Sequence, residues 1–103
     1  LVICNNDGMA EGAISALNAS GYNNGSGRTI PVFGVDATDA AKELIANGKM
    51  TGTIKQDAQG MAEAIRKLTQ NAVSGSAILS GMDGYDIDED AAKIRIQYSQ
   101  YLG

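Results

Sequence analysis

Amide and carboxylate side chains follow three apolar runs of the sequence, each just before a helix-like segment. They are Asn6, Asp36 and Gln56. In an open parallel sheet with helical crossovers, ligands bind beyond the carboxyl ends of the strands, where side chains from separate junctions converge. The spacing therefore predicts a binding site at one edge of a sheet.

The three side chains suit a neutral ligand that carries several hydroxyl groups. Asn6 and Gln56 each donate and accept hydrogen bonds through one amide, and Asp36 accepts charge-assisted hydrogen bonds from neighbouring hydroxyls. Lys55 is the only basic side chain at these junctions, and strand alternation turns it away from Gln56. The set favours a sugar over an anion.

Helix capping is the alternative role for these residues, because Asp and Asn before a helix often accept hydrogen bonds from its free N–H groups. Asp7 and Asp57 are better placed to cap the helices that follow them. This assignment leaves Asn6 and Gln56 for a ligand. The helix between the second and third strands is expected to be capped by Thr38 or Asp36.

The apolar periodicity predicts strands and helices in alternation. Strands are expected at about 1–4, 30–35 and 51–55, helices at about 8–20, 38–46 and 58–73, and two further strands at 85–87 and 92–98. The first run is continuously apolar, as in a strand covered on both faces. This order favours an α/β fold with a parallel sheet and right-handed crossovers.

The composition argues against several classes of function. The chain has 103 residues and a formal charge of -4, from 8 basic and 12 acidic side chains without a basic cluster, so we expect no nucleic-acid partner. It has no His and one Cys, Cys4, in an apolar run, and so lacks the usual nucleophile–base pairs of enzymes. The acidic turn 88–90 lacks the ligand spacing of a calcium loop. A non-enzymatic binding protein is expected.

Three motifs together resemble the C-terminal third of the periplasmic galactose/glucose-binding proteins of sugar ABC transporters. They are Asn5-Asn6-Asp7-Gly8-Met9-Ala10, Ile30-Pro31-Val32-Phe33-Gly34-Val35-Asp36-Ala37 and Gly52-Thr53-Ile54-Lys55-Gln56-Asp57. Residues 93–98 also resemble the last strand of that family. The similarity runs over nearly the whole chain.

The resemblance implies a type I periplasmic-binding-protein fold, in which two lobes with three-layer parallel sheets close on one sugar. Asn6, Asp36 and the position of Gln56 correspond to hydrogen-bonding sugar ligands. Galactose-binding members often have Asn at the third position, whereas Gln56 is similar to the ribose-binding relatives. By the same resemblance, residues 1–56 are part of the C-terminal lobe, 57–80 are a helix and linker of the other lobe, and 81–103 are a crossing segment and terminal strands.

The family also implies the surroundings of the protein. Its members deliver a monosaccharide to an ABC permease, and in many species to a chemoreceptor, in the periplasm or, tethered to the membrane, in species without an outer membrane. No cofactor is expected, and the calcium site of the family falls outside this chain. A full member is about three times as long, so we expect a fragment with half the sugar site.

Two other functions fit parts of the sequence. The effector domain of a sugar-responsive transcription repressor shares this fold and has similar junctions. The sequence of residues 33–37, however, is more typical of the transporter proteins. A receiver-like phosphoacceptor would need clustered carboxylates at the first junction, where this chain has two amides. For a fragment, the apolar stripe of Met61, Ile65 and Leu68 predicts a dimer or a swapped assembly.

Overall fold

The structure, a computed structural model, describes all residues from Leu1 to Gly103. It divides the chain into two compact units, one of residues 1–56 with 98–103 and one of residues 57–97. The first division falls directly after Gln56, so all three predicted site residues lie in the first unit. None of the helices is both long enough and apolar enough to cross a membrane.

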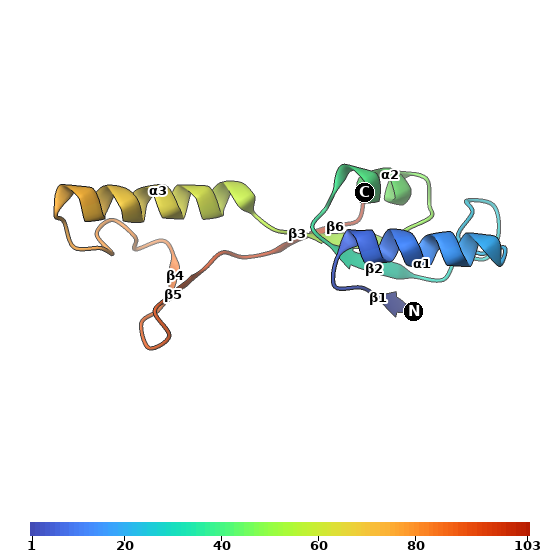
Figure 1. The fold of residues 1–103 in the computed structure, drawn as a ribbon, viewed down its shortest axis with the longest axis horizontal. Helices are drawn as coiled ribbons and strands as arrows, with labels where there is room; N and C mark the ends of the chain where they lie inside the picture. Colours follow the sequence, from blue (N-terminus) through green and yellow to red (C-terminus); the bar gives the residue numbers. More distant parts are fainter. The chain divides into compact units, whose positions relative to one another are not determined.

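The first unit is a small α/β sheet structure (Figure 1). Its elements are β1 (Val2–Ile3), α1 (Asp7–Ala19), β2 (Val32–Val35), α2 (Asp39–Ala46), β3 (Gly52–Lys55) and β6 (Ser99–Tyr101). The sheet order is β1-β2-β3-β6. β1, β2 and β3 are parallel, whereas β6 runs antiparallel to β3 with Ser99 opposite Lys55. The predicted α/β fold with a parallel sheet is confirmed.

Strand β6 was not predicted from the sequence. A single strand was expected over 92–98, but the structure has β5 (Lys93–Arg95) in the second unit and β6 after Tyr98 in the first. Only Tyr101 of β6 packs against the core. Backbone hydrogen bonds to the edge of β3 therefore define this strand, and such bonds leave no apolar pattern in the sequence.

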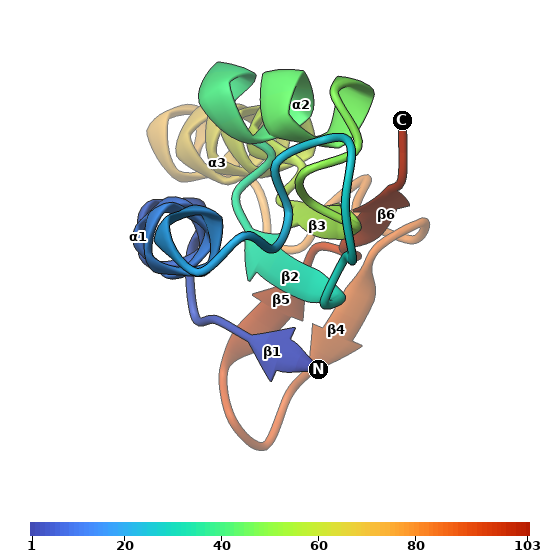
Figure 2. The ribbon, with the colours of Figure 1, turned by 90° about the vertical axis from the view of Figure 1, so that its right-hand side faces the viewer.

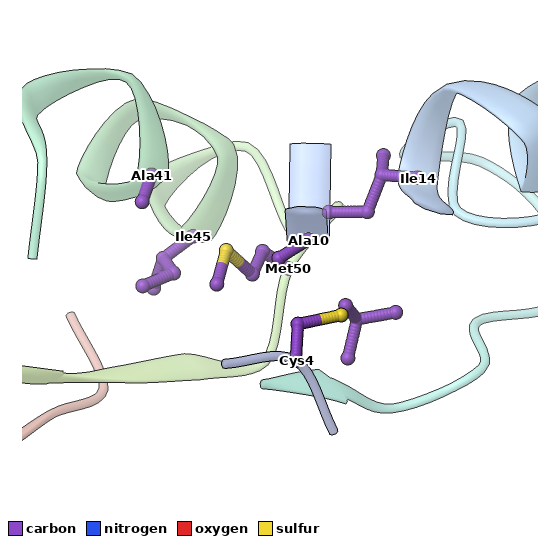
Figure 3. Packing of buried hydrophobic residues seen from close by; sticks show 7 residues of the cluster. Cys4, Ala10, Ile14, Ala41, Ile45 and Met50 are labelled. Carbon is purple, nitrogen blue, oxygen red and sulfur yellow. The ribbon is translucent and has the colours of Figure 1, made fainter. Parts of the chain in front are cut away.

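Helices α1 and α2 cover the same face of the sheet and enclose the core (Figures 2 and 3). The buried cluster consists of Cys4, Ala10, Ile14, Val32, Ala41, Ile45 and Met50. Cys4 lies in this cluster as a free thiol, which agrees with the packing expected of a small buried side chain. The core thus fixes both helices, and with them their N-terminal ends, against β1, β2 and β3.

The opposite face of the sheet carries apolar side chains that no helix of the first unit covers. Ile3 is opposite Phe33 in the register and is 76% exposed, and Leu102 is 62% exposed. The prediction that the first strand is covered on both faces is therefore wrong for this unit. Successive right-handed crossovers in one direction place both helices on one face, so the sheet of the first unit has one helical layer.

The second unit consists of helix α3 (Ala58–Ser74) and a hairpin of β4 (Asp86–Asp88) and β5. Asp57 caps α3 as predicted, because its Oδ1 accepts a hydrogen bond of 3.0 Å from Gly60 N. Gly75 ends the helix with a φ of 72°, a conformation that favours glycine. In the hairpin Ile87 pairs with Ile94. Assignment of this unit to another lobe stays a prediction.

Candidate functional site

The three predicted site residues lie at the carboxyl ends of the three parallel strands. Asp36 and Gln56 directly follow β2 and β3, and Asn6 lies before α1, between β1 and the helix. Gln56 Nε2 donates a hydrogen bond of 2.9 Å to Asp36 Oδ1. Asn6 shares no hydrogen bond with this pair and instead binds the backbone of α1. The structure therefore joins Asp36 to Gln56 and places Asn6 at the same edge.

Asp36 has an unusual backbone conformation. Its φ is 117° and that of Ala37 is 55°, and a side chain at positive φ costs about 1–3 kcal/mol when the conformation is sparsely populated. Asp36 N donates to Ile54 O over 2.8 Å, which anchors the residue to β3. Its carboxylate is exposed, and the hydrogen bonds within the protein engage only Oδ1. The second oxygen is available to a ligand.

Asn6 has a role that the sequence assigned to its neighbour. It is the N-cap of α1, in extended conformation with a φ of -152°, and its Oδ1 accepts from Met9 N over 2.8 Å. The predicted cap, Asp7, is instead the first residue of the helix. Since only the amide oxygen of Asn6 is used in capping, its NH₂ group remains exposed as a donor.

Asp7 is fully buried and binds groups in two other segments, strand β3 and the segment after β2. Its Oδ1 accepts from Thr53 Oγ1 over 2.6 Å, and its Oδ2 accepts from Thr38 N over 2.8 Å. Sequence reasoning missed this role. The available signal was Gly34 inside a strand, which indicates close approach of another group: a Cβ on Gly34 would overlap Asp7 Oδ1.

The second helix is capped by Thr38, one of the two predicted candidates. Thr38 Oγ1 accepts from Ala41 N over 3.2 Å, and the other candidate, Asp36, does not cap it. The ion pairs of the structure involve Asp39, Glu63 and Asp88. The carboxylate of Asp36 is thus bound to a neutral amide and has no cationic partner.

Comparison with known proteins identifies the family of the chain. Residues 1–77 match the family described as periplasmic binding protein domain. The chain belongs to this family. The matched region includes Asn6, Asp36 and Gln56, and it ends within the second unit. Periplasmic binding proteins are not enzymes, in agreement with the prediction from the composition.

Two curated binding proteins are similar to the chain. It is 37% identical over 81 residues to the D-galactose/methyl-galactoside binding periplasmic protein MglB of Haemophilus influenzae, covering 79% of this chain and 23% of that protein. It is 38% identical over 77 residues to a putative rhizopine-binding protein of Rhizobium meliloti, covering 75% of this chain and 24% of that protein. The chain therefore matches about a quarter of the length of these relatives.

Proposed function

We propose that the chain binds a monosaccharide of the galactose or glucose type through Asn6, Asp36 and Gln56. The observation that carries this proposal is the Asp36–Gln56 pair. Asp36 has a positive φ of 117°, its Oδ1 is bound by Gln56 Nε2, and its exposed Oδ2 faces no cation. A fixed carboxylate beside an amide suits adjacent sugar hydroxyls, which donate to the one and both donate to and accept from the other.

The names of the relatives support a sugar-like ligand. One is described as binding D-galactose and methyl-galactoside, and the other as binding rhizopine. Because the chain matches about a quarter of their length, the proposed role is half of a sugar site in the substrate-binding component of an ABC importer. In this role the protein works outside the cytoplasmic membrane, delivers sugar to a permease or chemoreceptor, and needs no cofactor.

The direct test is a titration of the chain with galactose, glucose and ribose, monitored by ¹⁵N–¹H NMR. This method detects the millimolar affinity expected of a half site, equivalent to about -4 kcal/mol. We expect shifts centred on the amides of residues 6, 36 and 56. Asp36→Ala should weaken binding at least tenfold, because a hydrogen bond to a charged group contributes about 1.5–3 kcal/mol.

Asp39→Ala is the matched control for this titration. Asp39 lies three residues away and is exposed, but its carboxylate pairs with Lys42 at 3.1 Å. This variant should bind sugar as the unmodified chain does. The proposal would be overturned if no shifts appeared at sugar concentrations up to about 100 mM, roughly 100 times the expected dissociation constant. An equal loss of affinity in the Asp36 and Asp39 variants would also overturn it.

A further inference from the structure

Residues 36–38, here called the site loop, have three consecutive backbone amides, and each donates a hydrogen bond to a separate acceptor. Asp36 N donates to Ile54 O over 2.8 Å, Ala37 N donates to Thr53 Oγ1 over 3.4 Å, and Thr38 N donates to Asp7 Oδ2 over 2.8 Å. The first acceptor belongs to the backbone of β3. The other two belong to one connected pair of buried side chains, because the Thr53 hydroxyl donates to Asp7 Oδ1 over 2.6 Å.

The pair is isolated from solvent. Asp7 is 0% exposed and Thr53 is 2% exposed, so water does not compete for these hydrogen bonds and each lost partner is costly. The carboxylate lies in the first turn of α1 and beside Thr38, the cap of α2. Helix N-termini favour negative charge, which helps to hold a carboxylate at this buried position.

We infer that Asp7 is the positioning residue of the site: through Thr38 N and the Thr53 hydroxyl it holds Asp36 and Ala37 at positive φ, so that Asp36 meets Gln56. The expected effect of Asp7 on sugar affinity rests on the proposed function. Its expected effect on φ of residues 36 and 37 does not depend on that function. Asp7 touches no ligand in this scheme. It joins the junction after β1 to the segment after β2 and to Thr53 within β3, and thereby fixes the relative positions of the strand ends that carry the exposed side chains.

Asn23, at the opposite end of the strands, provides a matched control. Asn23 is also 0% exposed, and it binds Ile30 N, Ile30 O and Lys49 O at 2.8, 2.7 and 3.0 Å. These partners precede β2 and β3, whereas the partners of Asp7 follow β2 or lie in β3. Removal of either side chain breaks a buried polar network, but only Asp7 contacts the site loop.

The experiment compares Asp7→Ala, Asp7→Asn and Asn23→Ala in the full chain without sugar. One-bond Cα–Hα couplings, which differ between positive and negative φ, report the sign of φ at residues 36 and 37, and hydrogen exchange reports the Thr38 amide. Asp7→Ala should shift both couplings to values for negative φ and speed exchange of the Thr38 amide at least tenfold. Asp7→Asn keeps an acceptor for Thr38 N and should restore most of the protection. Asn23→Ala should leave all three residues unchanged.

Sugar titration of the same variants supplies the second measurement. Asp7→Ala should weaken binding at least tenfold, and Asn23→Ala should not, once both are compared under conditions in which they are folded. If Asp7→Ala does not fold, Thr53→Val, which removes the hydroxyl and keeps the shape, takes its place. Unchanged couplings in the Asp7 or Thr53 variant, or equal losses of affinity with Asn23→Ala, would overturn the inference. If the unmodified chain binds no sugar, the proposed function fails and the couplings alone decide the role of Asp7.

Discussion

The polar residues at and near the strand ends occupy both exposed and buried positions. Asp36 and Gln56 are paired at the exposed edge by a hydrogen bond of 2.9 Å. Asp7, by contrast, is a buried carboxylate with two donors from other segments. The exposed groups are available for a ligand, and the buried carboxylate is hydrogen-bonded to Thr38 N and to Thr53 Oγ1. We therefore propose different roles for the two acidic residues, which differ in burial.

Gly34 is the residue that makes room for Asp7. A methyl group on Gly34 would overlap Asp7 Oδ1 and would lie 3.0 Å from Met50 Cε and 3.2 Å from Asp7 Cα. We expect Gly34→Ala to lower the free energy of unfolding by about 1–3 kcal/mol, the usual cost of overpacking. Urea unfolding followed by circular dichroism measures this change.

Gly12→Ala is the control for this substitution. Gly12 lies within α1, and an added Cβ would meet nothing within 4 Å. Since alanine is favoured over glycine inside a helix, this variant should be more stable by about 0.5–1 kcal/mol. Destabilisation by both substitutions, or by neither, would contradict the steric account of Gly34.

At the start of α1, helix capping and the proposed ligand would use the same side chain, that of Asn6. Asn6 shows how both are served. Its amide oxygen caps α1 at Met9 N, and its exposed NH₂ group is directed to no partner within the protein. The hydrogen bond to Met9 N restricts the side chain, so we expect the NH₂ group to bind a ligand with little further loss of conformational entropy.

Substitution of Asn6 separates these two roles. Asn6→Asp keeps an oxygen acceptor and should leave the free energy of unfolding nearly unchanged, because Asp and Asn are similar N-caps. It removes the NH₂ donor and should therefore weaken sugar binding. Asn6→Ala should weaken binding and also cost about 1 kcal/mol of stability. Chemical denaturation and sugar titration of both variants check this, and a loss of stability equal in the two would contradict it.

The elements were predictable from the sequence where local pattern determines them. The apolar runs and the residues after them located β1, β2, β3 and all three helices, because strand and helix periodicities differ. The exchange of roles between Asn6 and Asp7 was not predictable, since it depends on which residue has the extended φ. The bonds from Asp7 to Thr38 and Thr53 connect distant segments, and β6 depends on backbone pairing with β3.

At the scale of the whole molecule, both units have apolar surface that they do not cover themselves. In the first unit Ile3 is 76% exposed. In the second, α3 and the hairpin border an apolar groove of about 770 Å³ whose lining includes Met61, Ile65 and Leu68. The predicted stripe is thus partly open to solvent, with Met61 37% and Ile65 63% exposed. Exposed apolar patches of this kind promote association.

We therefore expect the chain to form dimers or larger assemblies at tens of micromolar. Ile65→Glu should shift the equilibrium toward monomer, because it places a charge in the groove. Val73→Glu is the control, since Val73 is 84% exposed on the same helix and is not part of the groove lining. Light scattering of the three proteins measures the mass. A monomer at all concentrations, or an equal effect of the two charges, would count against this expectation.

The pairing of β6 with β3 has a topological consequence. Lys55 and Ser99 are neighbours across two antiparallel strands, so the chain leaves the first unit and re-enters it at almost one point. Residues 57–97 are in this sense an insertion into a β-hairpin. Closing a loop of this size costs entropy, and a tenfold shorter connection would lower that cost by about 2 kcal/mol. The first unit is thus continuous in space although its sequence is interrupted.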